Sequence, residues 1–286
     1  QDYKVKEQGH ITDRINKAVE NLGAHKTNKD GETIPNLEVR IGGIFALERI
    51  AQDSLRDHIQ IMEILCAYIR KNSSLDKGED RKKPSRVDIQ IAFTVIGRRR
   101  QKQINTERKH NYKLDFTCID LNVINLEGLN FDYANFSFSN LYRVNFSGAS
   151  LISIRLQETN LDFVTLCNAN MQYATLTSSK ISNTIFDKAK IKNAVFNSLV
   201  FKRTISFKGL DLKDLKYFEW IAFKGVILEF GYKIDDSLLE NLFADGDSIF
   251  LEGVNWPKHW PKEKLGSRFD EGYRDWLGKK IGVKKE

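Results

Sequence analysis

The sequence contains only three cysteines among its 286 residues, Cys66, Cys118 and Cys167, and none of them lies in a CxxC motif. An odd number of cysteines at scattered positions argues against a disulfide framework and against a structural zinc site. The five histidines are equally scattered along the chain. We therefore expect a protein with reduced thiols that carries no metal and no cofactor.

Long hydrophobic runs are also missing. No apolar stretch approaches the roughly 18 residues needed to span a bilayer, and no stretch of the signal-peptide type opens the chain. These absences predict a soluble chain with a cytoplasmic location. Because the chain begins with Gln1 and not with Met, we expect a further segment upstream of it.

The common catalytic motifs are absent from the sequence. It contains no P-loop, no GxSxG and no HExxH, and Gly42-Gly43 lacks the spacing of a nucleotide-binding fingerprint. The acidic residues between Glu38 and Asp57 are explained as solvated or capping residues of helices. We therefore expect a protein that is not an enzyme and that has no small-molecule substrate.

The dominant feature of the chain is a bulky apolar residue at every fifth position from 116 to 201, over 18 consecutive periods. A helix brings every third or fourth residue to one face and a strand every second, so neither element keeps this period inside. A fixed short period is typical of a solenoid, in which each unit packs on its neighbours. We call these residues the centres: Phe116, Leu121, Leu126, Phe131, Phe136, Leu141, Phe146, Leu151, Leu156, Leu161, Leu166, Met171, Leu176, Ile181, Phe186, Ile191, Phe196 and Phe201.

The spacing also predicts the shape of the solenoid. Two residues before most centres lies a small or apolar residue, and residues two apart on an extended segment point the same way. If each group of five turns the chain through about a right angle, four groups close a square coil of about 20 residues, and coils stack at ~4.8 Å. Leu141, Leu161 and Ile181 should then lie one above another.

A polar residue stands directly before many centres, as in Ala134-Asn135-Phe136-Ser137-Phe138 and Ala169-Asn170-Met171-Gln172-Tyr173. Asn and Asp side chains bond back to the backbone of their own turn, as a corner in each group of five requires. The pattern A(D/N)LXX, over residues 114–203, resembles the pentapeptide-repeat family. The resemblance implies a right-handed quadrilateral β-helix without enzymatic activity. Family members with an assigned role mostly act by binding, the best known being DNA mimics that protect DNA gyrase from quinolone drugs.

The repeat departs from this pattern in two ways. Lys180, Ile185, Lys190, Val195 and Val200 replace the expected Asn or Asp, so we expect corners that are less well held in the late coils. Ser139, Thr159 and Ser179 occupy inward positions 20 residues apart, which predicts a column of hydroxyls on one wall. We expect these small polar groups to satisfy one another inside the core.

The chain before the repeat is predicted to be helical. Apolar spacing indicates helices near 11–22, 38–51, 58–69 and 87–97, with a polar loop at 21–35. Asp53 or Ser54 is the expected N-cap of the third helix, and Ser85 opens a capping-box-like start for the fourth. Several short helices before a solenoid indicate a cap over its open end.

The resemblance extends into this region. The stretches 37–51 and 87–99 are similar to the helical module that precedes the repeats in one bacterial branch of the family. That branch often carries transmembrane helices ahead of the module. The resemblance therefore implies a possible tether to the inner membrane, in a segment outside this chain.

After Phe201 the period breaks. We expect a helix over 212–223 and another that Asp235-Asp236 cap and that ends at Gly246. Trp256 and Trp260 are expected to plug a core edge, with contact to a partner as the alternative. The sequence thus predicts a mainly β fold with helical caps: an N-terminal helical module at 1–110, a pentapeptide-repeat β-helix at 111–206 and a C-terminal helical and aromatic cap at 207–286.

Charge is distributed unevenly along the chain. The net charge is +7, and residues 81–113 hold 11 basic against two acidic side chains. Within the repeat, residues 114–162 hold six acidic against two basic residues, whereas 163–206 hold one acidic against six basic ones. A solvated loop and helix end would explain the basic segment without any function. The candidate contacts for an anion or a partner are Arg81, Lys82, Lys83, Arg98, Arg99, Arg100, Lys188, Lys190 and Lys192.

Taken with the repeat, these features predict a non-enzymatic scaffold that binds a protein partner. One alternative is a membrane-proximal structural module, and another is a phosphate-binding protein whose 81–113 segment contacts nucleic acid or anionic lipid. DNA mimicry of a topoisomerase substrate is less favoured, because the coils are close to neutral overall.

Overall fold

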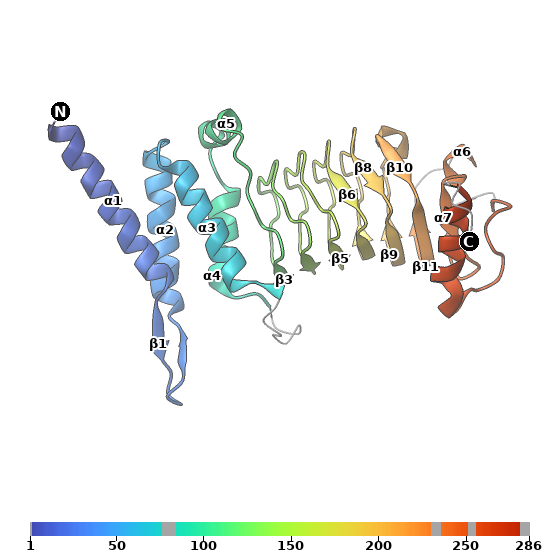
Figure 1. The fold of residues 1–286 in the computed structure, drawn as a ribbon, viewed down its shortest axis with the longest axis horizontal. Helices are drawn as coiled ribbons and strands as arrows, with labels where there is room; N and C mark the ends of the chain where they lie inside the picture. Colours follow the sequence, from blue (N-terminus) through green and yellow to red (C-terminus); the bar gives the residue numbers. More distant parts are fainter. Residues whose placement is uncertain (1, 76–83, 230–235, 251–255, 281–286) are drawn as a thin grey trace.

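The computed structural model describes residues 2–75, 84–229, 236–250 and 256–280. A row of helices leads into a long β-solenoid, and the chain ends in further helices at the opposite end of the molecule (Figure 1). The five N-terminal helices are α1 (Asp2–Leu22), α2 (Leu37–Asp53), α3 (His58–Asn72), α4 (Val87–Gly97) and α5 (Gln101–Lys109).

Four of these helices are the ones that the apolar spacing predicts, and α5 is not. In α5 only Gln103, Ile104 and Glu107 are buried, so its sequence has no hydrophobic period to reveal it. The polar loop expected at 21–35 is wrong, because the segment contains an antiparallel hairpin of β1 (His25–Thr27) and β2 (Thr33–Pro35). The hairpin joins α1 to α2 (Figure 1).

Two of the expected helix caps are also corrected. α3 begins at His58 after Asp57, and Ser54 ends α2, with its hydroxyl donating to Asp57 Oδ2 at 2.6 Å. Ser85 does not cap α4. Its amide donates to Asn122 O at 2.7 Å and its hydroxyl accepts from Asn122 N at 3.0 Å, so it ties the helices to the first coil.

The solenoid has four walls, each built from every fourth group of five. One parallel ladder runs the length of the solenoid, and its strands are β3 (Asp120–Asn122), β4 (Asn140–Tyr142), β5 (Asn160–Asp162), β7 (Lys180–Ile185), β9 (Val200–Ser206), β11 (Ile221–Glu229) and β12 (Leu242–Ala244), with β13 (Ile249–Phe250) beside β11. A second ladder contains β6 (Thr175–Thr177), β8 (Val195–Asn197) and β10 (Tyr217–Glu219). We call the walls first to fourth in chain order, beginning with the wall of β3.

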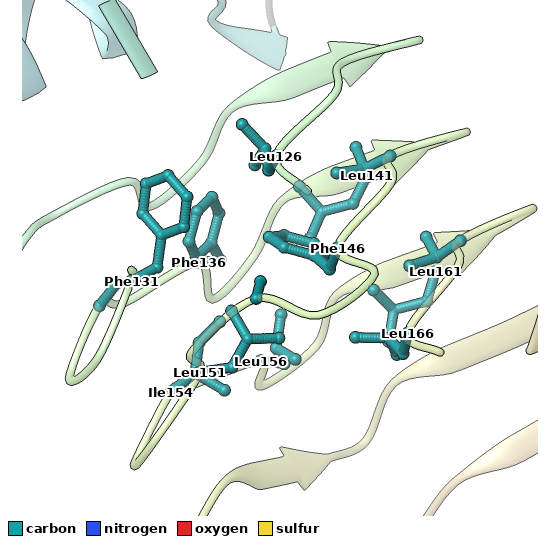
Figure 2. Packing of buried hydrophobic residues seen from close by; sticks show 14 of the residues in the cluster. Leu126, Phe131, Phe136, Leu141, Phe146, Leu151, Ile154, Leu156, Leu161 and Leu166 are labelled. Atoms are coloured by element: carbon teal, nitrogen blue, oxygen red, sulfur yellow. The ribbon is translucent and has the colours of Figure 1, made fainter. Parts of the chain in front are cut away.

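The register of the coils confirms the square geometry. Leu121 pairs with Leu141, Asn140 with Asn160, and Leu161 with Ile181, so the successive partners are 20 residues apart. All 18 centres are at most 1% exposed. Figure 2 shows centres of successive coils packed side by side within the solenoid, with Leu141 and Leu161 in corresponding places.

Each corner places one residue in the left-handed region. Positive φ recurs at every fifth residue from Cys118 to Arg203, two positions after each centre. The polar residue before the centre acts as expected: Asp115, Asn125 and Asn135 each accept a hydrogen bond from the backbone amide two residues later. A short turn held in this way closes each side of the square.

The hydroxyl column is present, but its bonding differs from the expectation. Ser139, Thr159 and Ser179 are all buried, and each hydroxyl donates to a backbone carbonyl of the preceding coil. Ser179 Oγ also accepts from Thr159 N at 3.1 Å. The hydroxyls therefore satisfy the backbone between coils instead of one another.

The late coils keep the fold with longer strands. Lys180, Ile185, Val195 and Val200 lie within strands, and β7, β9 and β11 span six, seven and nine residues. Backbone ladder bonds there take the place of the Asn and Asp side chains of the early coils. β-branched residues suit such extended backbone.

The solenoid does not end where the sequence period breaks. The helix expected over 212–223 is wrong, because this segment contains β10 and the start of β11, which pair with β8 and β9. The expected helix from Asp235 to Gly246 is mostly wrong as well: only α6 (Asp236–Leu239) is helical, and β12 follows it. The ladders thus run past the boundary that we expected at residue 206.

Both ends of the solenoid are covered. At the N-terminal end Phe93 of α4 packs on Phe116, with ring centroids 4.9 Å apart. At the C-terminal end α7 (Phe269–Lys280) packs on outward-facing residues of the first wall, where Phe269 and Trp276 form a cluster with Ala222 and Phe243. The helices therefore act as caps, as the sequence predicts.

Candidate functional site

The structure separates the predicted basic residues into three groups. Arg81, Lys82 and Lys83 lie outside the described residues. Arg98 and Arg99 are held in ion pairs inside the helical module, and Arg100 is exposed beside them. Lys188, Lys190 and Lys192 are exposed on the late coils. The described residues thus do not form one basic surface from the 81–113 segment.

Arg98 joins α4 to α2. Its guanidinium donates to both carboxylate oxygens of Glu48 at 2.6 Å and lies 5.9 Å from the centre of the Phe45 ring. The hydrogen bond with Glu48 raises the pKa of Arg98 above its ordinary value. A bidentate pair of this kind fixes the side chain in one orientation. Arg98 is therefore engaged within the fold.

Arg99 belongs to a buried polar network between α3 and α5. Its Nε lies 2.8 Å from Glu107 Oε1, and Glu107 also lies 2.7 Å from His58 Nε2. Gln103 donates to Ala51 O at 2.9 Å and lies 3.2 Å from His58 Nδ1. Because these side chains are buried, the network locks α5 against the helical module and leaves Arg99 unable to reach a ligand.

The orientation of this network follows from the backbone around it. Gln103 Oε1 accepts from the amide of Arg100 at 2.8 Å, which leaves its side-chain nitrogen to face both Ala51 O and His58 Nδ1. His58 Nδ1 must then accept, so Nε2 carries the proton and donates to Glu107. This arrangement satisfies every partner with a neutral imidazole and explains the burial of His58 as structural.

The buried thiols and phenols are not activated groups. Burial raises the pKa of Cys66 to about 12, and burial also raises the pKa of Tyr112, whose hydroxyl lies 4.0 Å from Cys66 Sγ. Burial likewise raises the pKa of Cys167. A reactive cysteine needs a lowered pKa, so neither thiol has the character of a nucleophile. Among the described residues, no group of three or more His, Cys, Asp or Glu side chains could hold a metal ion.

The two tryptophans of the tail lie against the C-terminal end of the solenoid. Trp260 is buried, and its indole nitrogen donates to Leu242 O at 2.7 Å. Trp256 is half-buried, donates to Trp260 O at 3.2 Å, and packs edge-on against the Trp260 ring. Trp260 stacks on Phe250, which in turn contacts Phe223 of the first wall. This geometry is that of a plug over the last coil.

The three lysines occupy neighbouring outward positions. Lys188 stands at the corner between the second and third walls, and Lys190 and Lys192 flank the buried centre Ile191 on the third wall. The alternation of a strand sends both of them outward. The early coils carry the acidic residues and the late coils the basic ones, so the two halves of the solenoid surface differ in charge as the sequence predicts.

The sequence analysis did not single out the side chains at the corner between the first and second walls. Val123, Arg143 and Phe163 stand there in successive coils, each with positive φ and each exposed, and Tyr142 lies beside Arg143. A signal was available, because a bulky residue two positions after a centre occupies a corner where Gly, Asn or Ser would be less strained.

The structure defines a β-solenoid repeat protein with helical caps. Its repeat is the pentapeptide repeat: residues 119–157 and 159–197 match the family described as "Pentapeptide repeats (8 copies)". No curated protein matches the chain. Among the described residues, no helix is both long and apolar enough to cross a membrane.

Solved structures that resemble the chain are pentapeptide-repeat proteins. Trypsin-treated QnrB1, a plasmid-mediated fluoroquinolone resistance protein, is 14% identical, with 61% of this chain and 87% of that chain covered and a TM-score of 0.25. HetL from Nostoc sp. strain PCC 7120, involved in heterocyst differentiation regulation, is 16% identical, with 48% and 70% covered and a TM-score of 0.22. Rfr23 from Cyanothece 51142 is 20% identical, with 43% and 64% covered and a TM-score of 0.18.

Proposed function

We propose that this protein is a non-enzymatic scaffold whose rigid solenoid presents its outer walls to a protein partner. The observation that carries the proposal is the complete burial of the 18 centres, which leaves the outward residues of each coil as the contact surface. Burial of about 2 kcal/mol per large centre makes the rod stiff, so it should change shape little on binding. A stiff surface also loses little conformational entropy when a partner docks.

The helical module and the C-terminal plug support this function by closing the solenoid. An open last coil would expose both a core and an unpaired strand edge, and such an edge recruits other chains without specificity. Here α4 covers one end and the plug of Trp256 and Trp260 covers the other. Specific contacts are then left to the walls and corners.

A second candidate function is contact with an anionic surface, either nucleic acid or membrane. It is favoured by the exposure of Lys188, Lys190 and Lys192 on neighbouring positions of the late coils. Phosphate contacts of this kind weaken steeply as salt rises. A membrane-proximal location through a segment outside this chain belongs to the same proposal.

Pull-down with cross-linking from native lysate tests the scaffold function. The bait is the full chain, and the comparison bait is a variant with Phe138, Val123 and Phe163 replaced by Asn, which suits positive φ. We expect a stoichiometric protein partner on the wild type. Capture of nucleic acid or lipid alone, with no protein partner at any salt concentration, would contradict the scaffold function.

Charge reversal tests the anionic-surface candidate and should use Lys188, Lys190 and Lys192, because reversal of Arg98 or Arg99 would break ion pairs of the helical module. Binding to DNA or to anionic vesicles that weakens with salt and is lost in the Lys to Glu variant would support it. Binding that stays constant as salt rises would reject it.

A further inference from the structure

The corner between the first and second walls carries an arginine held between two aromatic rings. The guanidinium of Arg143 lies 5.0 Å from the ring centre of Tyr142 and 5.5 Å from that of Phe163. The two rings themselves pack edge to face, with centroids 5.7 Å apart and planes at 79°. Tyr142 and Arg143 belong to one coil and Phe163 to the next, so the ladder between the coils brings the three together.

The arginine has no acidic partner within the fold. Among the described residues, no carboxylate lies within ion-pair distance of Arg143, and the cluster leaves its side chain exposed. The carboxylates of the same two walls are already engaged: Asp120 accepts from Asn140, Glu127 from Asn145, and Asp162 from Asn183. Stacking on the rings occupies the faces of the guanidinium and leaves its N–H edges available.

The backbone of this corner is strained without a return inside the fold. Val123, one coil before Arg143, has φ of 56°, and a β-branched residue at positive φ costs about 1–2 kcal/mol. The side chains of Val123 and Phe163 remain 47% and 40% exposed. At the next corner of the same coils the chain uses Gly128 and Gly148, which adopt positive φ without strain.

From these observations we propose that the corner formed by Val123, Tyr142, Arg143 and Phe163 is a docking site for a protein segment that presents a carboxylate beside an apolar side chain. The proposal rests on the proposed scaffold function and names the chemistry of its partner. The fork of Arg143 would bind the carboxylate in a bidentate manner, and Val123 and Phe163 would contact the apolar neighbour. Arginine and tyrosine are enriched among the residues that dominate interface energies.

The charge of the surrounding coils favours a protein over a nucleic acid. Residues 114–162 hold six acidic against two basic side chains, so a polyanion would be repelled along the early coils. A segment with a single carboxylate meets the one available cation of the corner and adds little repulsion elsewhere. Aromatic rings with an arginine could also stack on bases, and an oligonucleotide arm in the experiment distinguishes that case.

The test is panning of a random peptide library on the full chain, followed by fluorescence anisotropy of the selected peptides. We expect the selected peptides to share an Asp or Glu next to a large apolar residue. Arg143→Ala should weaken their binding by at least about tenfold, as expected of a dominant interface residue. The matched control is Arg155→Ala, which removes the other arginine of the early coils from the fourth wall and should leave binding unchanged.

Two further variants sharpen the test. Arg143→Lys keeps the charge but loses the planar fork, so it should recover only part of the affinity. Replacement of the peptide carboxylate by its amide should cost about as much as Arg143→Ala, and the two changes together should not add. Thermal melting establishes that each variant is folded, and Phe163→Asn probes the same site should Arg143→Ala fail to fold.

Peptides that bind wild type and Arg143→Ala equally would overturn the corner site and leave the scaffold function standing. Peptides that keep their affinity as amides would overturn the carboxylate, and oligo-dT that binds more tightly than any selected peptide and loses its affinity in Arg143→Ala would overturn the choice of a protein partner. A library from which no peptide is selected would contradict the docking site, whereas the scaffold function is judged separately by the lysate experiment.

Discussion

Phe223 lies directly over Phe201 in the first wall, with the two rings stacked at 5.4 Å and their planes 20° apart, although 22 residues separate them in the chain. In the early coils the same separation is 20 residues. Bulges absorb the difference, one between Ser182 and Thr184 in the pairing of β7 with β9, and another between Lys224 and Val226. The solenoid therefore tolerates single-residue insertions as long as the inward alternation of each wall resumes.

The first prediction compares two phenylalanines that stand two residues apart in one coil. Phe136 is fully buried and packs on Phe116 at 4.8 Å, whereas Phe138 stands at a corner and is 45% exposed. Phe136→Ala leaves a cavity and should lower the free energy of unfolding by about 3–5 kcal/mol. Phe138→Ala should change it by less than about 0.5 kcal/mol. Urea denaturation followed by circular dichroism measures both, and equal losses would contradict the square coil.

The second prediction concerns the cost of a left-handed corner. Gly128 has φ of 67° and open space around its α-carbon, so Gly128→Ala should cost about 1 kcal/mol for conformational reasons alone. Val123→Gly removes strain of about 1–2 kcal/mol but adds chain entropy, so it should be neutral or stabilising by up to about 1 kcal/mol. Thermal melting of the two single variants measures the difference. A Val123→Gly protein that melts clearly below the wild type would show that the corner is not strained.

Much of the solenoid could be predicted from its period. The centres, the stacking of Leu141, Leu161 and Ile181, and the turn bonds of Asn125 and Asn135 all follow from positions within five residues, where the physics is local. The late coils could not be predicted in the same way. Inserted residues there shift the period, and Leu212 to Phe223 then shows apolar spacing that mimics a helix.

The candidate site was less accessible from the sequence than the fold. Arg98, Arg99 and Arg100 form a conspicuous triplet, but the partners of the first two, Glu48 and Glu107, come from elements whose packing only the structure shows. Conversely, Arg143 is a single arginine in an acidic stretch, and its meaning depends on Phe163 one coil away. Contacts between coils become visible only once the 20-residue register is known.

The third prediction tests the hydroxyl column. Thr159 is buried, and its hydroxyl donates to Phe136 O at 3.2 Å in the coil before it. Thr159→Val keeps the shape but leaves that carbonyl without this donor, so it should cost about 1–2 kcal/mol of unfolding free energy. Thr165→Val on an outward position of the second wall is the matched control and should be close to neutral. If both substitutions were neutral, the hydroxyls would be passengers of a well-packed core.

The fourth prediction concerns acid sensitivity of the helical module through Asp88. Asp88 is fully buried, and its carboxylate accepts from Tyr68 and, at 2.8 and 3.1 Å, from the guanidinium of Arg86. Burial acts to raise the pKa of Asp88, but these hydrogen bonds and the charge of Arg86 outweigh it and hold the pKa below its ordinary value. In the same cluster, burial and the bond to Asp88 raise the pKa of Tyr68 to about 12.

The sign of the pH effect follows from the lowered pKa of Asp88. A carboxylate that is easier to ionise in the folded state than in the unfolded state adds stability above the unfolded pKa of about 4, and this stability is lost as pH falls through the folded value. We therefore expect the helices to unfold at lower urea concentration at about pH 3 than at neutral pH. Asp88→Asn should cost about 3 kcal/mol at neutral pH, because it leaves Arg86 without its partner, and it should weaken the acid dependence. Asp53→Asn, at an exposed position of α2, is the control that should change neither; an Asp88→Asn protein with an unaltered acid dependence would show that other carboxylates control it.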